Sequence, residues 1–163
     1  MSRPPTPADR RRQAKLMKLL NVPMRALLSL PVPTPLGGRL MLVSHTGRRT
    51  GRRYRQPVSY VSHDGVLLTP GGGRWTSNLK QGEPTRIRLR GRDISARPEL
   101  VTDPDLVETL LGVMRAANSS LDRFVRLPKT PEGRYERTPL EAAIRHGFCV
   151  VRWHPDGGPA PSA

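Results

Sequence analysis

Five arginines gather in one short stretch of the sequence, between an apolar run that ends at Ser44 and another that begins at Pro57. Glycines at positions 47 and 51 allow positive φ angles there, so backbone N–H groups can line a concave turn. Guanidinium groups donate paired hydrogen bonds to phosphate or carboxylate oxygens. The stretch is an anion-binding turn or, as the alternative, a solvated hairpin. Its arginines are Arg48, Arg49, Arg52, Arg53 and Arg55.

A glycine-rich loop and an aromatic motif follow the arginines. The loop is Pro70-Gly71-Gly72-Gly73, and after Arg74 the motif reads Trp75-Thr76-Ser77-Asn78-Leu79. Three glycines after a strand let the backbone pass close to a flat or bulky group, although a flexible connector is the alternative. Together the two stretches indicate an anionic ligand with a flat portion, held by the arginines at its charged end and bordered by Trp75 at the other.

Other site chemistries find little support in the sequence. The four histidines, His45, His63, His146 and His154, lack the spacing of a metal site and are expected to be structural or exposed. Cys149 is the only cysteine, so no internal disulfide can form, and its apolar neighbours predict a buried strand thiol. No G-x-S-x-G motif, Rossmann fingerprint or P-loop occurs.

The charge of +15 is concentrated in the first part of the chain. Residues 1–100 contain 20 Lys and Arg against 5 Asp and Glu, whereas residues 101–163 contain 8 of each kind. This excess implies a polyanionic partner: a nucleic acid, an anionic membrane surface, or a cofactor with phosphate and carboxylate groups. Nucleic acid is disfavoured because only 4% of the residues are aromatic, which leaves few side chains for base stacking.

The elements that must position these residues are mainly strands. Alternating apolar residues and the Asp64-Gly65 turn signal predict a β-meander around the arginines and the glycine loop. Thr102 to Asp105 begin a helix that runs to about Ala117, and a shorter helix covers Leu140–Arg145. Trp75–Lys80 is expected as one helical turn, and Ser119–Thr138 as irregular. The strands are expected at Leu40–Ser44, Tyr54–Ser62, Val66–Thr69, Thr85–Leu89, Asp93–Val101 and Gly147–Trp153.

This order of elements predicts an α+β, mainly β fold: a small, partly open β-barrel with a helix inserted before the last strand. Residues 1–36 form a basic, Pro-rich segment with an amphipathic helix at Asp9–Leu20. Residues 37–154 form the barrel domain, and residues 155–163 a disordered tail. No apolar run reaches 18 residues, and Lys18, Pro23 and Arg25 interrupt the only stretch that could serve as a signal peptide.

The motifs together resemble one family. Thr46-Gly47-Arg48-Arg49-Thr50-Gly51, then Pro57-Val58, a hairpin, the glycine-rich loop and Trp75-x-x-Asn78-Leu79 are similar to the deazaflavin (F420)-dependent nitroreductases, which have a split β-barrel of the FMN-binding-like kind. The similarity covers about Leu40 to Val101 and is weaker as far as Trp153. It implies hydride transfer from reduced coenzyme F420 to quinones, nitro compounds or enones.

The resemblance also implies which residues bind the cofactor, with FMN as the alternative to F420. Arg48, Arg49 and Thr50 would meet the phosphate and polyglutamate tail. The strand beneath the deazaflavin would supply Tyr54, Arg55, Gln56, Pro57, Val58 and Ser59. The loop that wraps the ring would supply Pro70, Gly71, Gly72, Gly73, Arg74, Trp75, Thr76, Ser77 and Asn78.

We therefore expect a cytoplasmic F420-dependent oxidoreductase acting on a small electron acceptor. The hydride would pass over a slot near Ser59, Tyr60 and Trp75, with Tyr60 or Tyr135 as the candidate proton donor. Two alternatives remain: a non-catalytic binder of an anionic cofactor or lipid, and a basic nucleic-acid-binding module. The N-terminal basic helix is a candidate for peripheral contact with the inner face of the membrane, for capping the barrel, or for the partner surface of a homodimer.

Overall fold

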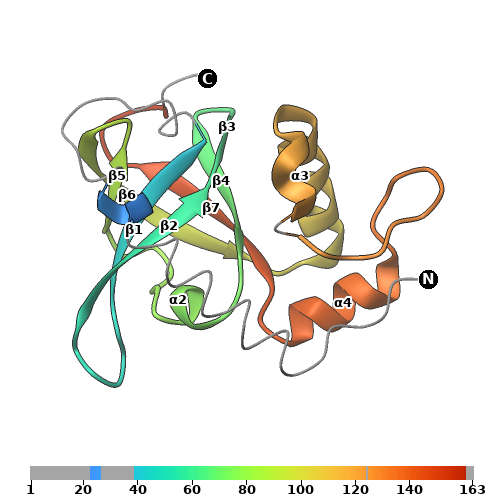
Figure 1. The fold of residues 1–163 in the computed structure, drawn as a ribbon, viewed down its shortest axis with the longest axis horizontal. Coiled ribbons are helices and arrows are strands. Elements are labelled where there is room, and N and C mark those ends of the chain that lie inside the picture. The colour runs from blue at the N-terminus through green and yellow to red at the C-terminus, as the bar shows by residue number, and fades with distance from the viewer. Residues whose placement is uncertain (1–22, 27–38, 124, 161–163) are drawn as a thin grey trace.

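The computed structural model describes residues 23–26, 39–123 and 125–160 (Figure 1). Seven strands form one antiparallel sheet with the order β2-β1-β5-β6-β7-β4-β3. The strands are β1 (Leu40–Thr46), β2 (Arg53–Ser59), β3 (Val61–His63), β4 (Val66–Gly71), β5 (Thr85–Leu89), β6 (Arg92–Val101) and β7 (Cys149–Pro155).

The sheet curls because its two edge strands are consecutive in the chain. Only Tyr60 separates β2 from β3, so the two edges of the sheet meet at that residue. The right-handed twist of the strands accumulates across the sheet and brings these edges together at one end. The result is a partly open barrel, mainly β with helices before the last strand, and the predicted split β-barrel fold class is confirmed.

The helices fall into two groups. The single turn α2 (Arg74–Ser77) follows β4, whereas α3 (Pro104–Ala117), the 3₁₀ helix η2 (Ser119–Arg123) and α4 (Arg137–Arg145) lie between β6 and β7. In Figure 1, α3 and α4 stand on one side of the barrel and the β1–β2 hairpin projects on the other. Helix α3 begins where the sequence predicts, because the Asp103 carboxylate accepts a 2.9 Å hydrogen bond from the Leu106 N–H.

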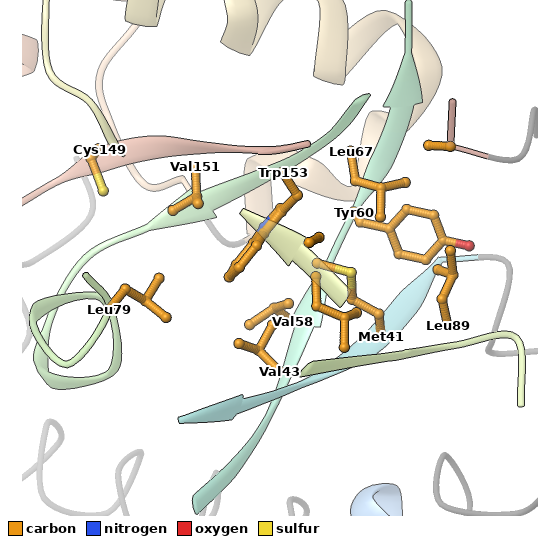
Figure 2. Packing of buried hydrophobic residues seen from close by; sticks show 13 residues of the cluster. Met41, Val43, Val58, Tyr60, Leu67, Leu79, Leu89, Cys149, Val151 and Trp153 are labelled. Carbon is orange, nitrogen blue, oxygen red and sulfur yellow. The ribbon is translucent and has the colours of Figure 1, made fainter. Parts of the chain in front are cut away.

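Two hydrophobic clusters stabilise the domain. The barrel interior is filled by Met41, Val43, Ile87 and Val151 around the fully buried Trp153 (Figure 2). The Trp153 indole N–H donates a 3.0 Å hydrogen bond to the Thr69 hydroxyl, so the polar edge of the ring is satisfied. The second cluster packs α3 on the outer face of the sheet, through Val107, Leu111, Met114, Leu68 and Val150.

One predicted strand is two strands in the structure. The expected strand Tyr54–Ser62 breaks at Tyr60, whose N–H still donates to the Arg39 carbonyl at 3.1 Å. The apolar pattern continues through the break because Tyr60 is only 4% exposed, so periodicity could not reveal the bend. Helix α4 begins at Arg137, three residues earlier than predicted.

The tail predicted to be disordered, residues 155–163, needs a correction as far as Ala160, whereas residues 161–163 lie outside the described residues. Residues 156–160 pack on the barrel: the Ala160 N–H donates to the Gly65 carbonyl at 2.8 Å, and Ala160 is 7% exposed. Proline and glycine suggested disorder, but here they allow the chain to turn onto the β3–β4 hairpin.

The N-terminal prediction lies largely outside the described residues. This is the case for the helix at Asp9–Leu20 and for all of residues 1–36 except 23–26, which form a helical turn that begins at Pro23. Of the helices in the described ranges, none has the length and apolar character needed to span a membrane.

Candidate functional site

The arginine turn, residues 47–53, closes the β1–β2 hairpin. The Gly47 N–H donates to the Arg52 carbonyl at 2.8 Å, and the Gly51 N–H donates to the Gly47 carbonyl at 2.9 Å. Gly51 has a φ of +63°, a conformation that side chains disfavour. A Cβ on Gly47 would lie 2.9 Å from the Tyr54 ring and from the Thr50 hydroxyl oxygen. Both glycines are therefore required by the turn itself.

The turn docks on α2 through Arg48. The Arg48 backbone N–H donates to Asn78 Oδ1 at 3.2 Å, and its Nη1 donates to the Ser77 carbonyl at 3.1 Å. That carbonyl lies at the C-terminal end of the helical turn, where a cation is favourable. The two stretches that carry the family resemblance, about 30 residues apart in the sequence, are thus in direct contact.

The remaining arginines of the turn are available for a ligand. Arg49, Arg52 and Arg53 are exposed, and their side chains make no hydrogen bond or ion pair with any residue in the described ranges. Arg48 uses part of its guanidinium on α2. The Thr50 hydroxyl oxygen accepts a weak 3.4 Å hydrogen bond from the Arg52 N–H. The hairpin therefore carries three clustered cations without a counter-charge from these residues.

His45, which the sequence analysis treated as structural or exposed, belongs to this site. Its Nδ1 lies 3.2 Å from Asn78 Nδ2, and its ring stacks on Tyr54 with a centroid distance of 5.5 Å. Burial, and then the nearby charge of Arg25, lower the pKa of His45. If residues are counted outward along the two strands from the arginine turn, His45 pairs with Tyr54. This strand register is the signal in the sequence that could have placed His45 at the site.

The predicted strand Tyr54–Ser59 cannot present all its side chains to one ligand. Successive side chains alternate across a strand, so Tyr54 and Val58 share the face of β2 that packs toward the barrel cluster. Gln56 lies on that same face, whereas Arg55, Pro57 and Ser59 lie on the other. Ser59 is 6% exposed.

The two tyrosines predicted as proton donors lie in different places. Tyr60 pairs with Arg39, before the start of β1, so it lies roughly 20 Å along the strands from the arginine turn at about 3.3 Å per residue. Figure 2 places it across the barrel cluster from Leu79, which closely follows α2. The Tyr60 hydroxyl accepts a 3.3 Å hydrogen bond from Arg90.

Tyr135 belongs to the second cluster, beside α3. Its hydroxyl donates to the Asp122 carboxylate at 3.2 Å, and burial, followed by the charge of Asp122, raises the pKa of Tyr135 to about 12. Tyr135 therefore does not lie at the arginine turn, whereas Tyr60 and Trp75 both border the barrel cluster, so the slot near Ser59, Tyr60 and Trp75 stays a prediction.

The glycine loop is explained by the protein's own packing. A Cβ on Gly71 would lie 2.7 Å from Cys149 Sγ and 2.9 Å from a Thr76 methyl carbon. Gly72 and Gly73 have φ angles of +146° and +75°, which favour glycine. The backbone at Gly71 thus passes close to other residues of the barrel. Cys149 is 4% exposed and burial raises its pKa to about 11, so the predicted buried thiol is confirmed.

A second row of arginines, formed by Arg86 and Arg88 on β5 and by Arg90 just after it, is partly neutralised. Arg86 and Arg88 both form ion pairs with Asp93, across the β5–β6 ladder. Arg90 bonds Tyr60. This row is therefore a weaker anion site than the arginine turn.

The described residues contain no group of three or more side chains that could hold a metal ion. A cavity of about 330 Å³ lies beside α3, away from the arginine turn. Of the predicted site residues only Tyr135 lines it, together with Asp105, Glu108, Thr109, Gly112, Arg115 and Arg134.

The chain is similar to solved structures at low sequence identity. No family model and no curated protein matches the chain. General Stress Protein 26 from Bacillus anthracis has 16% identity and a TM-score of 0.46, over 73% of this chain and 81% of that one. A proposed 5-nitroimidazole antibiotic resistance protein from Bacteroides thetaiotaomicron has 12% identity and a TM-score of 0.45, over 74% and 75%. Neither similarity places the chain in a family.

Proposed function

We propose that this chain is an oxidoreductase of the flavin or deazaflavin type, and that the arginine turn and α2 bind the anionic end of its cofactor. Coenzyme F420 is the leading cofactor and FMN the alternative. The contact of Arg48 with Ser77 and Asn78 carries the proposal, because it joins the two motifs on which the resemblance to F420-dependent nitroreductases rests.

The donors present fit such a ligand. A tail of phosphate and several carboxylates needs clustered donors that are not already engaged. Arg49, Arg52 and Arg53, which bond no side chain in the described ranges, offer these on the exposed hairpin. Arg48 holds the turn in place, and its guanidinium is partly engaged by Ser77. When bound, reduced F420 would supply the hydride for a quinone, nitro compound or enone.

The residues of this chain have a limited part in the proposed chemistry. They bind and orient the cofactor, and the transfer itself needs no side-chain acid. Tyr60 and Tyr135 are 4% exposed and already hydrogen-bonded, and neither lies at the arginine turn. The proposal therefore assigns neither of them the proton.

A second candidate is a non-catalytic binder of an anionic cofactor. It is favoured by the ring end of the proposed site, since Ser59 and Tyr60 are buried. The tight approach at Gly71 is also to Cys149, within the barrel, so it needs no ligand. The arginine turn serves this function equally well.

A fluorescence titration separates the two candidates. F420, FMN and FAD are each added to the full chain, and reduced F420 is then mixed with a quinone, a nitroaromatic compound and an enone. Binding of F420 at micromolar concentration with oxidation by one acceptor supports the enzyme. Binding without oxidation by any acceptor supports the second candidate. Absence of F420 binding at micromolar concentration contradicts F420 as the cofactor.

A further inference from the structure

Asn78 joins three parts of the site. Its Oδ1 accepts the Arg48 backbone N–H at 3.2 Å, and its Nδ2 lies 3.2 Å from His45 Nδ1. Asn78 directly follows α2, so its amide links α2 to the end of β1 and to the arginine turn. With the carbonyl of Ser77, which accepts from Arg48, these bonds hold the turn against α2.

The hydrogen-bond chemistry fixes the state of each group. The Arg48 backbone N–H can only donate, so the Asn78 amide must turn its oxygen to Arg48 and its NH₂ group to His45. An NH₂ group needs an acceptor, and His45 Nδ1 is one only when it carries no proton. His45 is therefore neutral, with its proton on Nε2.

The surroundings of His45 agree with this state. The charged or titratable groups beside it are Arg25 from residues 23–26, Arg48 in the turn, and Tyr54 on β2. In the described ranges no carboxylate bonds His45, so nothing there favours the imidazolium. Its Nε2 is buried and has no hydrogen-bond partner among these residues, but Nε2 carries a proton in both states, so this cost does not favour the imidazolium.

We infer that neutral His45, acting through Asn78, is a positioning residue that helps to hold the arginine turn against α2, and that protonation of His45 weakens this contact. Protonation places an N–H against the Asn78 NH₂ group. Turning the amide over to satisfy His45 would set the same NH₂ group against the Arg48 N–H. No orientation of Asn78 then satisfies both neighbours.

The direction of the pH response follows. The folded structure lowers the pKa of His45 below its ordinary value of 6.5, so the contact is complete above about pH 6.5 and is lost as the pH falls through the folded-state pKa. The response concerns the site of the proposed function, but it needs no cofactor.

NMR on the ¹⁵N-labelled full chain, without cofactor, tests the inference. At pH 7.5 we expect a proton on Nε2 and none on Nδ1 of His45. As His45 titrates, the protection of the Arg48 amide against hydrogen exchange should fall about fivefold, the equivalent of one hydrogen bond. The Gly47 amide, bonded within the hairpin to Arg52, is the internal control and should keep its protection. A proton on Nδ1 at pH 7.5, or unchanged Arg48 protection while His45 titrates, overturns the inference.

Two variants sharpen the test. His45→Asn places a non-titrating amide oxygen near the position of Nδ1, so Arg48 should stay protected from pH 7.5 to pH 5. His45→Phe keeps a ring against Tyr54 but has no acceptor, so Arg48 should be less protected at both pH values. A pH response that survives in His45→Asn overturns the inference. These results are independent of the F420 titration, so failure of either one is recognised separately.

Discussion

In the helical layer, formed by α3, η2, the segment 125–136 and α4, four of the cations each bond a carboxylate or carbonyl oxygen, although Arg123 and Arg145 bond none in the described ranges. In the arginine turn, three neighbouring arginines bond none in these ranges. Arg134 donates two bonds to Glu108, at 2.9 and 3.1 Å. The other three cations are Arg115, Lys129 and Arg137.

The difference separates charges that serve the fold from charges that await a partner. A paired cation beside Tyr135 contributes to the packing of the helical layer and leaves little field for a ligand. Clustered cations such as Arg49, Arg52 and Arg53 repel one another, and an external anion relieves that repulsion. The comparison therefore predicts that binding depends on the turn and folding stability on the helical layer.

The largest expected effect comes from replacing Arg49, Arg52 and Arg53 together by alanine. Each charged hydrogen bond to the F420 tail contributes about 1.5–3 kcal/mol. The affinity should therefore fall by at least about 100-fold, as measured by fluorescence titration. The free energy of unfolding should change by less than about 0.5 kcal/mol per site, because these side chains are exposed.

A matched control removes the same charge elsewhere. Arg92, Arg123 and Arg145 are exposed, lie outside the turn, and are also without a partner in the described ranges. Their triple alanine variant should retain F420 affinity within a few-fold at physiological salt, because distant exposed charges are screened. Equal losses in the two triple variants would contradict a localised anion site.

Much of the fold could be predicted because its signals are local. The alternation of polar and apolar residues predicted β5 at Thr85–Leu89. The Asp64-Gly65 pair predicted a hairpin turn, and Asp103 predicted the start of α3. The bend at Tyr60 could not be predicted, since a buried aromatic residue fits a continuous strand as well as a bent one.

The site was harder to predict because its contacts are distant in the sequence. The arginines and Trp75-x-x-Asn78 were recognised as two motifs, but the bond from Arg48 to Ser77 depends on how α2 closes the barrel. The need for glycine at position 71 comes from Cys149, on a strand at the other end of the sequence. Neither contact has a local pattern.

A smaller effect is expected in the helical layer for Tyr135→Phe. The variant removes the 3.2 Å bond to Asp122 from a side chain that is 4% exposed. The free energy of unfolding in urea should fall by about 1–2 kcal/mol, and F420 affinity should not change. If turnover fell while stability and affinity held, Tyr135 would take part in the chemistry, as the sequence analysis hypothesised.

The smallest effect is expected for Glu108. Its pH dependence distinguishes the helical layer from the arginine turn. Hydrogen bonding from Arg134 lowers the pKa of Glu108 from its ordinary value of 4.5, so the pair stabilises the fold above about pH 4.5 and this contribution is lost as the pH falls through the folded-state pKa. At neutral pH, Glu108→Gln should cost less than about 1 kcal/mol, because Arg134 is largely exposed.

The same variant should flatten the loss of stability in acid, as measured by urea unfolding at pH 3, 4, 5 and 7. Arginines do not titrate in this range, so the side chains of Arg49, Arg52 and Arg53 should contribute nothing to that slope, and their triple alanine variant should follow the wild-type profile. If Glu108→Gln kept the wild-type acid slope while the turn variant lost it, the assignment of folding charges to the helical layer and ligand charges to the turn would be reversed.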